Sequence, residues 1–275
     1  MSVRSPDFGT AEAFAKSWNN LPSGPTYSYE QVVDWFHPIS KDDIEGKTVL
    51  ELGCGNGSLM FHLLKWGPKK LHGVDLGDSV SSARDTLSKS GFLNWTIEQA
   101  DLVGYQSSDY DFVYSIGVLH HLECPKKGFK AVIRNVKAGG QFHCWVYGRA
   151  GNGIVVYLVD PLRRLVSKFP WWVIKYCVAT PLSILLFMYV RITVKPLLKK
   201  IFWRMPLYKY CTWLNKRGYK FVHHVVTDQL ISPRTVYIRK EIIEQWFRST
   251  SRIQMSTTYI IKRNGNSWKF GGKVV

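Results

Sequence analysis

A glutamate followed by three alternating glycines is the sharpest chemical signal in this sequence. The stretch KTVLELGCGNGSL covers residues 47–59 and places Gly53, Gly55 and Gly57 shortly after Glu51. The apolar run before Glu51 predicts a buried strand. Glycines after a strand let the backbone turn tightly and approach a ligand, and the helix that follows offers free N–H groups. The pattern predicts a loop that binds a nucleotide-like cofactor at the end of a strand.

Two further acids follow apolar runs at distances that suit the same site. LHGVDLG, residues 71–77, predicts a second strand ending in Asp75, whose carboxylate suits the neighbouring hydroxyls of a ribose. EQADL, residues 98–102, predicts the end of a third strand, with Asp101 and Leu102 at its exit. We expect cofactor and substrate to meet beyond the carboxyl ends of these strands.

YDFVYSIGVLHHL, residues 110–122, predicts a fourth strand and its exit, and VKAGGQFHCWVYG, residues 136–148, predicts a fifth. In this order the five landmarks resemble the class I S-adenosylmethionine-dependent methyltransferases, in particular their small-molecule and quinone-type branch. The resemblance covers about residues 45–150 and resumes near 235–275. It implies an α/β fold with a Rossmann-like, seven-stranded, mostly parallel sheet, and S-adenosylmethionine as the cofactor.

The resemblance also implies roles for individual residues. Glu51 is expected at the ammonium end of the cofactor, usually through water, and Asp75 at its ribose hydroxyls. Asp101 is expected to meet the adenine amino group, and Leu102 the adenine ring or its backbone edge. The predicted cofactor-binding residues are Glu51, Gly53, Gly55, Gly57, Asp75, Asp101, Leu102 and Ser115.

Side chains at the exits of the fourth and fifth strands are the candidates for acceptor chemistry. His120 and His121 titrate near neutral pH, so either is a candidate general base for the proton of an acceptor hydroxyl. Alternatively, one or both cap the following turn, because methyl transfer from a sulfonium often needs only alignment. Tyr147 and Arg149 are expected to face the acceptor.

Two classes of site are disfavoured by the sequence. The fourth strand exits in GVLHH and lacks the N/D-P-P-Y/F motif of enzymes that methylate base amines, which argues against a nucleic acid substrate despite a pI of about 9.7. His223 and His224 lack spaced partners, so no metal site is predicted. The five cysteines are scattered and no apolar leader opens the chain, so we expect a reduced, cytoplasmic compartment.

The flanking segments must complete the fold around these residues. Residues 27–39 predict a helix that begins after Ser28 and stops at Pro38; it either closes over the cofactor or packs in the core. Residues 237–251 predict an amphipathic helix, and a hairpin turning at Asn264-Gly265-Asn266 follows.

The chain therefore divides into four predicted parts. Residues 1–45 are expected to form a helical cap and residues 46–150 the cofactor-binding core. Residues 151–232 are expected to form a helical insertion after the fifth strand, and residues 233–275 to complete the sheet.

The insertion concentrates the positive charge of the protein. Residues 161–220 contain thirteen Lys and Arg and no Asp or Glu, whereas the rest of the chain is nearly balanced. Prolines interrupt the apolar stretches, and the longest stretch between them, residues 181–195, reaches only about 22 Å as a helix, short of the ~30 Å hydrocarbon core of a bilayer. Short apolar helices with tryptophans and basic residues suit the interface of an anionic leaflet.

We therefore expect a methyltransferase that docks on the inner face of a membrane as a peripheral or monotopic protein. Its expected acceptor is a small amphipathic or lipid-linked molecule. Three alternatives stay open for the insertion: a lid, a subunit interface, or a true span over residues 170–190. The rivals for function are a methyltransferase of soluble metabolites, with the insertion as lid or dimer interface, and a non-catalytic scaffold that binds partners through the insertion.

Overall fold

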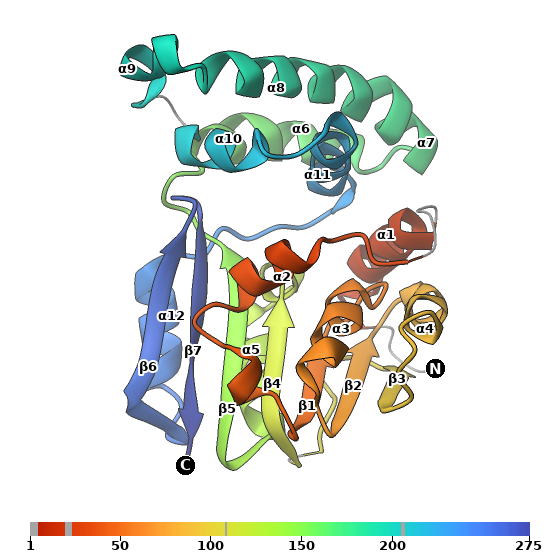
Figure 1. The fold of residues 1–275 in the computed structure, drawn as a ribbon. Helices are drawn as coiled ribbons and strands as arrows, with labels where there is room; N and C mark the ends of the chain where they lie inside the picture. The colour runs from red at the N-terminus through yellow and green to blue at the C-terminus, as the bar shows by residue number, and fades with distance from the viewer. Residues whose placement is uncertain (1–4, 20–23, 108, 205–206) are drawn as a thin grey trace.

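The computed structural model describes residues 5–19, 24–107, 109–204 and 207–275. A seven-stranded sheet lies at its centre, in the order β3-β2-β1-β4-β5-β7-β6 (Figure 1). The strands are β1 Thr48–Leu52, β2 Lys70–Asp75, β3 Trp95–Gln99, β4 Tyr110–Ile116, β5 Val136–Tyr147, β6 Ile253–Arg263 and β7 Ser267–Val274. β1 to β5 pair in parallel, and the β6–β7 hairpin adds to β5 antiparallel. The predicted fold class is confirmed.

Alternation along the strands separates two apolar cores, one on each face of the sheet. Val49 packs in one core while Leu50 and Leu52 pack in the other, because successive side chains of a strand point to opposite faces. α5 (Pro125–Asn135) and α12 (Lys240–Arg248) supply side chains to the second core. α2 (Tyr29–Phe36) and α3 (Ser58–Leu63) supply side chains to the first, and α4 (Ser79–Ser88) packs beside α3.

The predicted start of α2 is confirmed. The Ser28 hydroxyl accepts a hydrogen bond from the Gln31 N–H, and the Gln31 side chain accepts from the Ser28 N–H at 2.9 Å. This reciprocal capping satisfies two backbone donors at the start of the helix. The preceding helix, α1 (Phe8–Asn19), packs against α4 and against the insertion helix α11 (Tyr219–Ile231).

Between β5 and α12 the chain is mostly helical, and its helices lie above the carboxyl ends of the parallel strands (Figure 1). α11 and α6 (Asp160–Val166) lie closer to the sheet, as does α10 (Tyr208–Leu214). α7 (Trp171–Val173) and α8 (Thr180–Thr193) form the outermost layer, followed by α9 (Lys199–Phe202). The four-part division of the chain stays a prediction.

The predicted interruption at Pro181 is wrong. One continuous helix runs over Trp171–Thr193, and we call it the α7–α8 helix. A wide π-turn over Ile174–Ala179 precedes Pro181, and the Thr180 hydroxyl donates to the carbonyl of Lys175 at 2.9 Å. The widened turn accommodates the proline ring, which would clash with the backbone of a regular helix. The Thr180 hydroxyl supplies a hydrogen bond to a carbonyl of that turn.

The α7–α8 helix is longer than the proline spacing predicted. Its 23 residues extend about 35 Å, and its mean hydropathy of 1.8 makes it the one helix of the described residues long and apolar enough to cross a membrane. Only 22% of the apolar part of this helix is buried within the protein. Length alone therefore does not exclude a span.

Candidate active site

A cavity of about 690 Å³ lies at the carboxyl ends of the parallel strands, beneath the insertion helices. One side is formed by loops that follow the strands, and the other by side chains of the insertion. The strand-side residues include Glu51, Gly53, Gly55, Asp75, Asp101 and Leu102. The insertion-side residues include Leu158, Leu162, Leu182, Leu186, Phe221 and Val225. The volume falls in the range of small-molecule sites, and the insertion contributes an apolar wall.

The three glycines after β1 have different structural roles. Gly53, Gly55 and Gly57 all have positive φ, at 86°, 52° and 74°, where side chains other than glycine are strained. A Cβ on Gly53 would lie 2.4 Å from a methyl group of Val118. A Cβ on Gly57 would lie 3.3 Å from Ala83 of α4, and Gly57 does not line the cavity. The loop therefore presents backbone to a ligand at Gly53 and Gly55.

Glu51 carries a buried carboxyl with one unused oxygen. The Tyr114 hydroxyl donates to Oε2 at 2.8 Å, while Oε1 has no hydrogen-bond partner among the described residues. Burial raises the pKa of Glu51 to about 8, although the Tyr114 hydrogen bond lowers it. An orphaned acceptor that lines a cavity suits a cationic donor group of a ligand.

Asp75 joins the ends of the first two strands. Its Oδ2 accepts from the Gly55 N–H at 2.8 Å, and its Oδ1 accepts from the Gly77 N–H at 3.0 Å. Burial raises the pKa of Asp75 and these hydrogen bonds lower it. Oδ1 also accepts from the Ser79 hydroxyl at 3.1 Å, so Oδ2 keeps the lone pair that can accept from a ligand hydroxyl. Asp101 accepts from the Val103 N–H at 2.9 Å and also lines the cavity.

Four predicted site residues lie outside the cavity lining: Gly57, Ser115, His120 and Arg149. Ser115 is fully buried in β4, where its hydroxyl donates to the carbonyl of Leu52 at 2.8 Å. It therefore ties β4 to β1. The Arg149 guanidinium lies 3.4 Å from the hydroxyl of Tyr157 at an exposed position. Neither placement fits the predicted contact with cofactor or acceptor.

The two adjacent histidines differ in environment. His120 is completely buried, with its ring centroid 4.1 Å from that of Tyr147, and burial lowers its pKa well below the usual value. His121 lines the cavity, and its Nδ1 donates to the carbonyl of Arg234 at 2.9 Å. Burial lowers the pKa of His121 to about 4, so it is a weak base.

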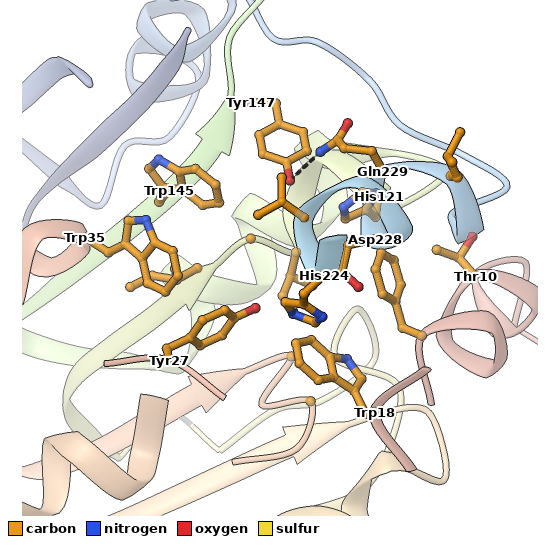
Figure 2. Close-up of a pocket in the computed structure, with 18 of the residues that line it drawn as sticks. Thr10, Trp18, Tyr27, Trp35, His121, Trp145, Tyr147, His224, Asp228 and Gln229 are labelled. Atoms are coloured by element: carbon orange, nitrogen blue, oxygen red, sulfur yellow. Dashed lines mark hydrogen bonds and ion pairs between the residues drawn. The ribbon is translucent and has the colours of Figure 1, made fainter. Parts of the chain in front are cut away.

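Sequence reasoning missed a polar group that the insertion brings to the cavity. Figure 2 shows His224 and Asp228 of α11 beside Trp18 and Tyr27 from the N-terminal region. The four-residue spacing of His224 and Asp228 on a helix was the available signal. Tyr147, which was predicted to face the acceptor, lines the cavity and its hydroxyl accepts from the Gln229 amide at 2.8 Å.

Comparisons with known sequences match part of the chain. Residues 49–140 match a family model described as "Methyltransferase domain". A tRNA U34 carboxymethyltransferase of Helicobacter acinonychis is 26% identical over 118 residues, covering 41% of this chain and 45% of that protein. The same enzyme of Idiomarina loihiensis is 29% identical over 106 residues, covering 36% and 32%. The chain thus spans less than half the length of these curated relatives.

Solved structures resemble the chain over most of its length. An S-adenosylmethionine-dependent methyltransferase of Aquifex aeolicus has a TM-score of 0.52 at 13% identity, covering 95% of this chain and 98% of that one. Magnesium protoporphyrin IX methyltransferase of Synechocystis has a TM-score of 0.50 at 15% identity, covering 90% and 82%. At such identities these likenesses establish the fold.

The prediction that nucleic acid is disfavoured as a partner is wrong. The relatives above are named tRNA U34 carboxymethyltransferases, which conflicts with that prediction.

Proposed function

The chain belongs to the class I S-adenosylmethionine-dependent methyltransferases, and from this premise we propose that it methylates a small amphipathic or lipid-linked acceptor at a membrane surface. The observation that carries the proposal is that one cavity brings the strand-end acids together with the apolar wall of the insertion. A charged cofactor fits the first side and an apolar molecule the second.

The residues at the strand ends fit the cofactor. When bound, S-adenosylmethionine supplies an electrophilic methyl group on a sulfonium sulfur. The unpartnered oxygen of Glu51 suits the ammonium group, and the remaining lone pair on Oδ2 of Asp75 suits a ribose hydroxyl. Gly53 and Gly55 let the backbone approach closely.

The insertion side favours an acceptor with an apolar body. Leu162, Leu182 and Leu186 line the cavity together with aromatic side chains, so a polar acceptor would lose water without regaining hydrogen bonds there. Enclosure by these side chains holds the acceptor against the cofactor and excludes competing water.

The outer surface of the insertion supports membrane docking. The exposed apolar side chains of the α7–α8 helix include Trp172, Tyr176, Ile184, Leu185, Met188 and Ile192, which we call the outer face. Lys168, Arg191 and Lys195 are exposed near them, and residues 161–220 contain no acid. Apolar burial and attraction to anionic lipids act together on such a surface.

The packing of the α7–α8 helix favours lying on the membrane over crossing it. Its opposite side is buried against α10 and α11 through Ile174, Ala179 and Val190. A spanning helix would have to leave these contacts to be surrounded by lipid. A helix that keeps them presents only its outer face.

Methyl-labelled S-adenosylmethionine identifies the acceptor class. The purified protein is incubated with this cofactor and a cell extract, which is then separated into organic-soluble lipid, water-soluble metabolites and tRNA. We expect label in the lipid fraction and none with a Gly55→Val variant. Label in tRNA or in water-soluble metabolites would overturn the proposed acceptor. Cofactor binding without label in any fraction would indicate a non-catalytic scaffold.

A further inference from the structure

A histidine and an aspartate of the insertion lie together in the cavity. His224 and Asp228 are one turn apart on α11, with Nε2 of the ring 3.2 Å from Oδ2 of the carboxylate. The side chains are 11% and 18% exposed, and both line the cavity (Figure 2). Ion pairs between residues four apart on a helix usually lie on its exposed surface. This pair instead faces the enclosed cavity where the acceptor is expected.

The hydrogen-bonding capacity of this pair is incompletely used. Within the described residues Oδ1 of Asp228 has no hydrogen-bond partner, and Oδ2 lies out of line for a hydrogen bond to Nε2 of His224. Burial raises the pKa of Asp228, and the positive charge of His224 lowers it. A buried ionisable pair with spare capacity is costly to the folded state and is typical of functional sites.

Aromatic rings connect the pair to the cofactor loop. The His224 ring centroid lies 5.6 Å from that of Trp18 and 6.4 Å from that of Tyr27. Trp18 in turn lies over the glycine loop, since its Nε1 is 3.5 Å from the position that a Cβ on Gly55 would take. A planar molecule in this part of the cavity would have aromatic faces around it and His224 at its edge.

We propose that His224, held by Asp228, is the general base that takes the proton of a phenolic acceptor hydroxyl. The inference rests on the proposed function, because it assigns a base to that methyl transfer. The negative charge of the Asp228 carboxylate, 3.2 Å from Nε2, favours the tautomer with its proton on that atom and leaves Nδ1 as the acceptor. No other described residue that lines the cavity presents a histidine ring beside a carboxylate.

The step balances in atoms and charge. The O–H bond of the acceptor breaks and its proton passes to Nδ1 of His224, while the oxygen electron pair forms the new O–C bond. The C–S bond breaks with its electron pair staying on sulfur. The positive charge thus moves from the sulfonium to the imidazolium, where the Asp228 carboxylate stabilises it.

Acidity selects a phenol over an alkyl alcohol. An ordinary imidazole has a pKa of about 6.5 and a phenol of about 10, whereas hydroxyls comparable with water lie near 15.7. Transfer from a phenol is within reach of a histidine base, and transfer from an alcohol is far less favourable. His121 is the weaker candidate, because its pKa is about 4 and its Nδ1 is engaged by the Arg234 carbonyl.

4-Nitrophenol tests the proton transfer without the natural acceptor, because its ionised form absorbs at a longer wavelength. The purified protein is saturated with S-adenosylhomocysteine and titrated with the probe about one pH unit below the solution pKa of the probe. We expect the bound probe to be ionised about tenfold more than the free probe. Binding of unionised probe, or no binding to the wild type, would overturn the proposal.

Variants of α11 assign the effect. His224→Gln should abolish the excess ionisation and Asp228→Asn should reduce it, while both keep their affinity for S-adenosylhomocysteine. His223→Gln is the matched control, because His223 contacts Thr180 at 3.1 Å and does not line the cavity. Equal ionisation in His224→Gln and the wild type, or an equal loss in His223→Gln, would contradict the assignment. Failure of the wild type to bind S-adenosylhomocysteine would instead count against the proposed function.

Discussion

At the scale of single residues, the buried carboxyl of Glu51 makes cofactor affinity depend on pH. Its pKa of about 8 means that it is mostly protonated at pH 7, so pairing with an ammonium group must release a proton. We expect the affinity for S-adenosylhomocysteine to rise by up to about tenfold per pH unit from pH 6 toward 8 and then to level off. Calorimetry across this range measures it.

Glu51→Gln is the control for this dependence. The amide cannot ionise, so the affinity should be weaker at pH 8 and should lose most of its rise between pH 6 and 8. The direction of the change follows from linkage. A carboxyl whose pKa is raised in the free protein is protonated at lower pH and must lose that proton to bind an ammonium group, so affinity falls as the pH falls. A rise of the same size in Glu51→Gln would assign the effect to another group.

The glycine loop provides a second prediction at this scale. Gly55→Val places a branched side chain at a φ of 52° and into the cavity, so binding of S-adenosylhomocysteine should fall by about 100-fold or more. Gly91→Val is the matched control: Gly91 has a φ of 77° and nothing within 4 Å of an added Cβ, and it does not line the cavity. Equal affinities in the two folded variants would contradict the site.

At the scale of elements, the α7–α8 helix carries a prediction about membranes. Leu185 is 62% exposed on its outer face, and Leu185→Glu replaces an apolar contact with a charge that anionic lipid repels. We expect flotation with phosphatidylglycerol-containing vesicles to fall by about tenfold or more. High salt should weaken the binding of the wild type without abolishing it, because apolar burial is not screened.

Leu93→Glu is the control for the flotation experiment. Leu93 is 96% exposed between α4 and β3, outside the insertion, so the same change there adds the same charge without touching the outer face. Flotation of this variant should match the wild type. If Leu185→Glu also floats as the wild type does, the outer face is a subunit interface or a lid instead.

The elements that sequence patterns predicted well are those determined locally. Apolar runs ending in Glu51 and Asp75 predicted β1 and β2, and the Ser28 cap predicted α2. Pro181 was predicted to begin a new helix, whereas the helix continues through it. The π-turn that makes this possible depends on the preceding residues of the helix and cannot be predicted from the proline alone. The proline rule holds for regular helices, and the preceding turn here is widened.

At the scale of the molecule, the acceptor side of the site was the part beyond reach of sequence reasoning. Strand order brings together the acids at the carboxyl ends of three strands, and the family resemblance supplies that order. The contact between Trp18 and His224 joins residues two hundred positions apart through packing of α1 on α11. Ser115 and His120 show the converse: both are buried outside the cavity lining, whereas their sequence neighbours Ile116 and His121 line the cavity.

The arrangement of the insertion in layers has a kinetic consequence. Leu182 and Leu186 of α8 line the cavity, while Leu185 of the same helix faces outward. One helix, about 10 Å across, thus separates the part of the cavity lined by Leu182 and Leu186 from the proposed lipid surface. An acceptor dissolved in that surface would be encountered in two dimensions, so turnover should follow its mole fraction in the bilayer. Diluting the acceptor with inert phospholipid, at constant total amount, should then slow the reaction in proportion.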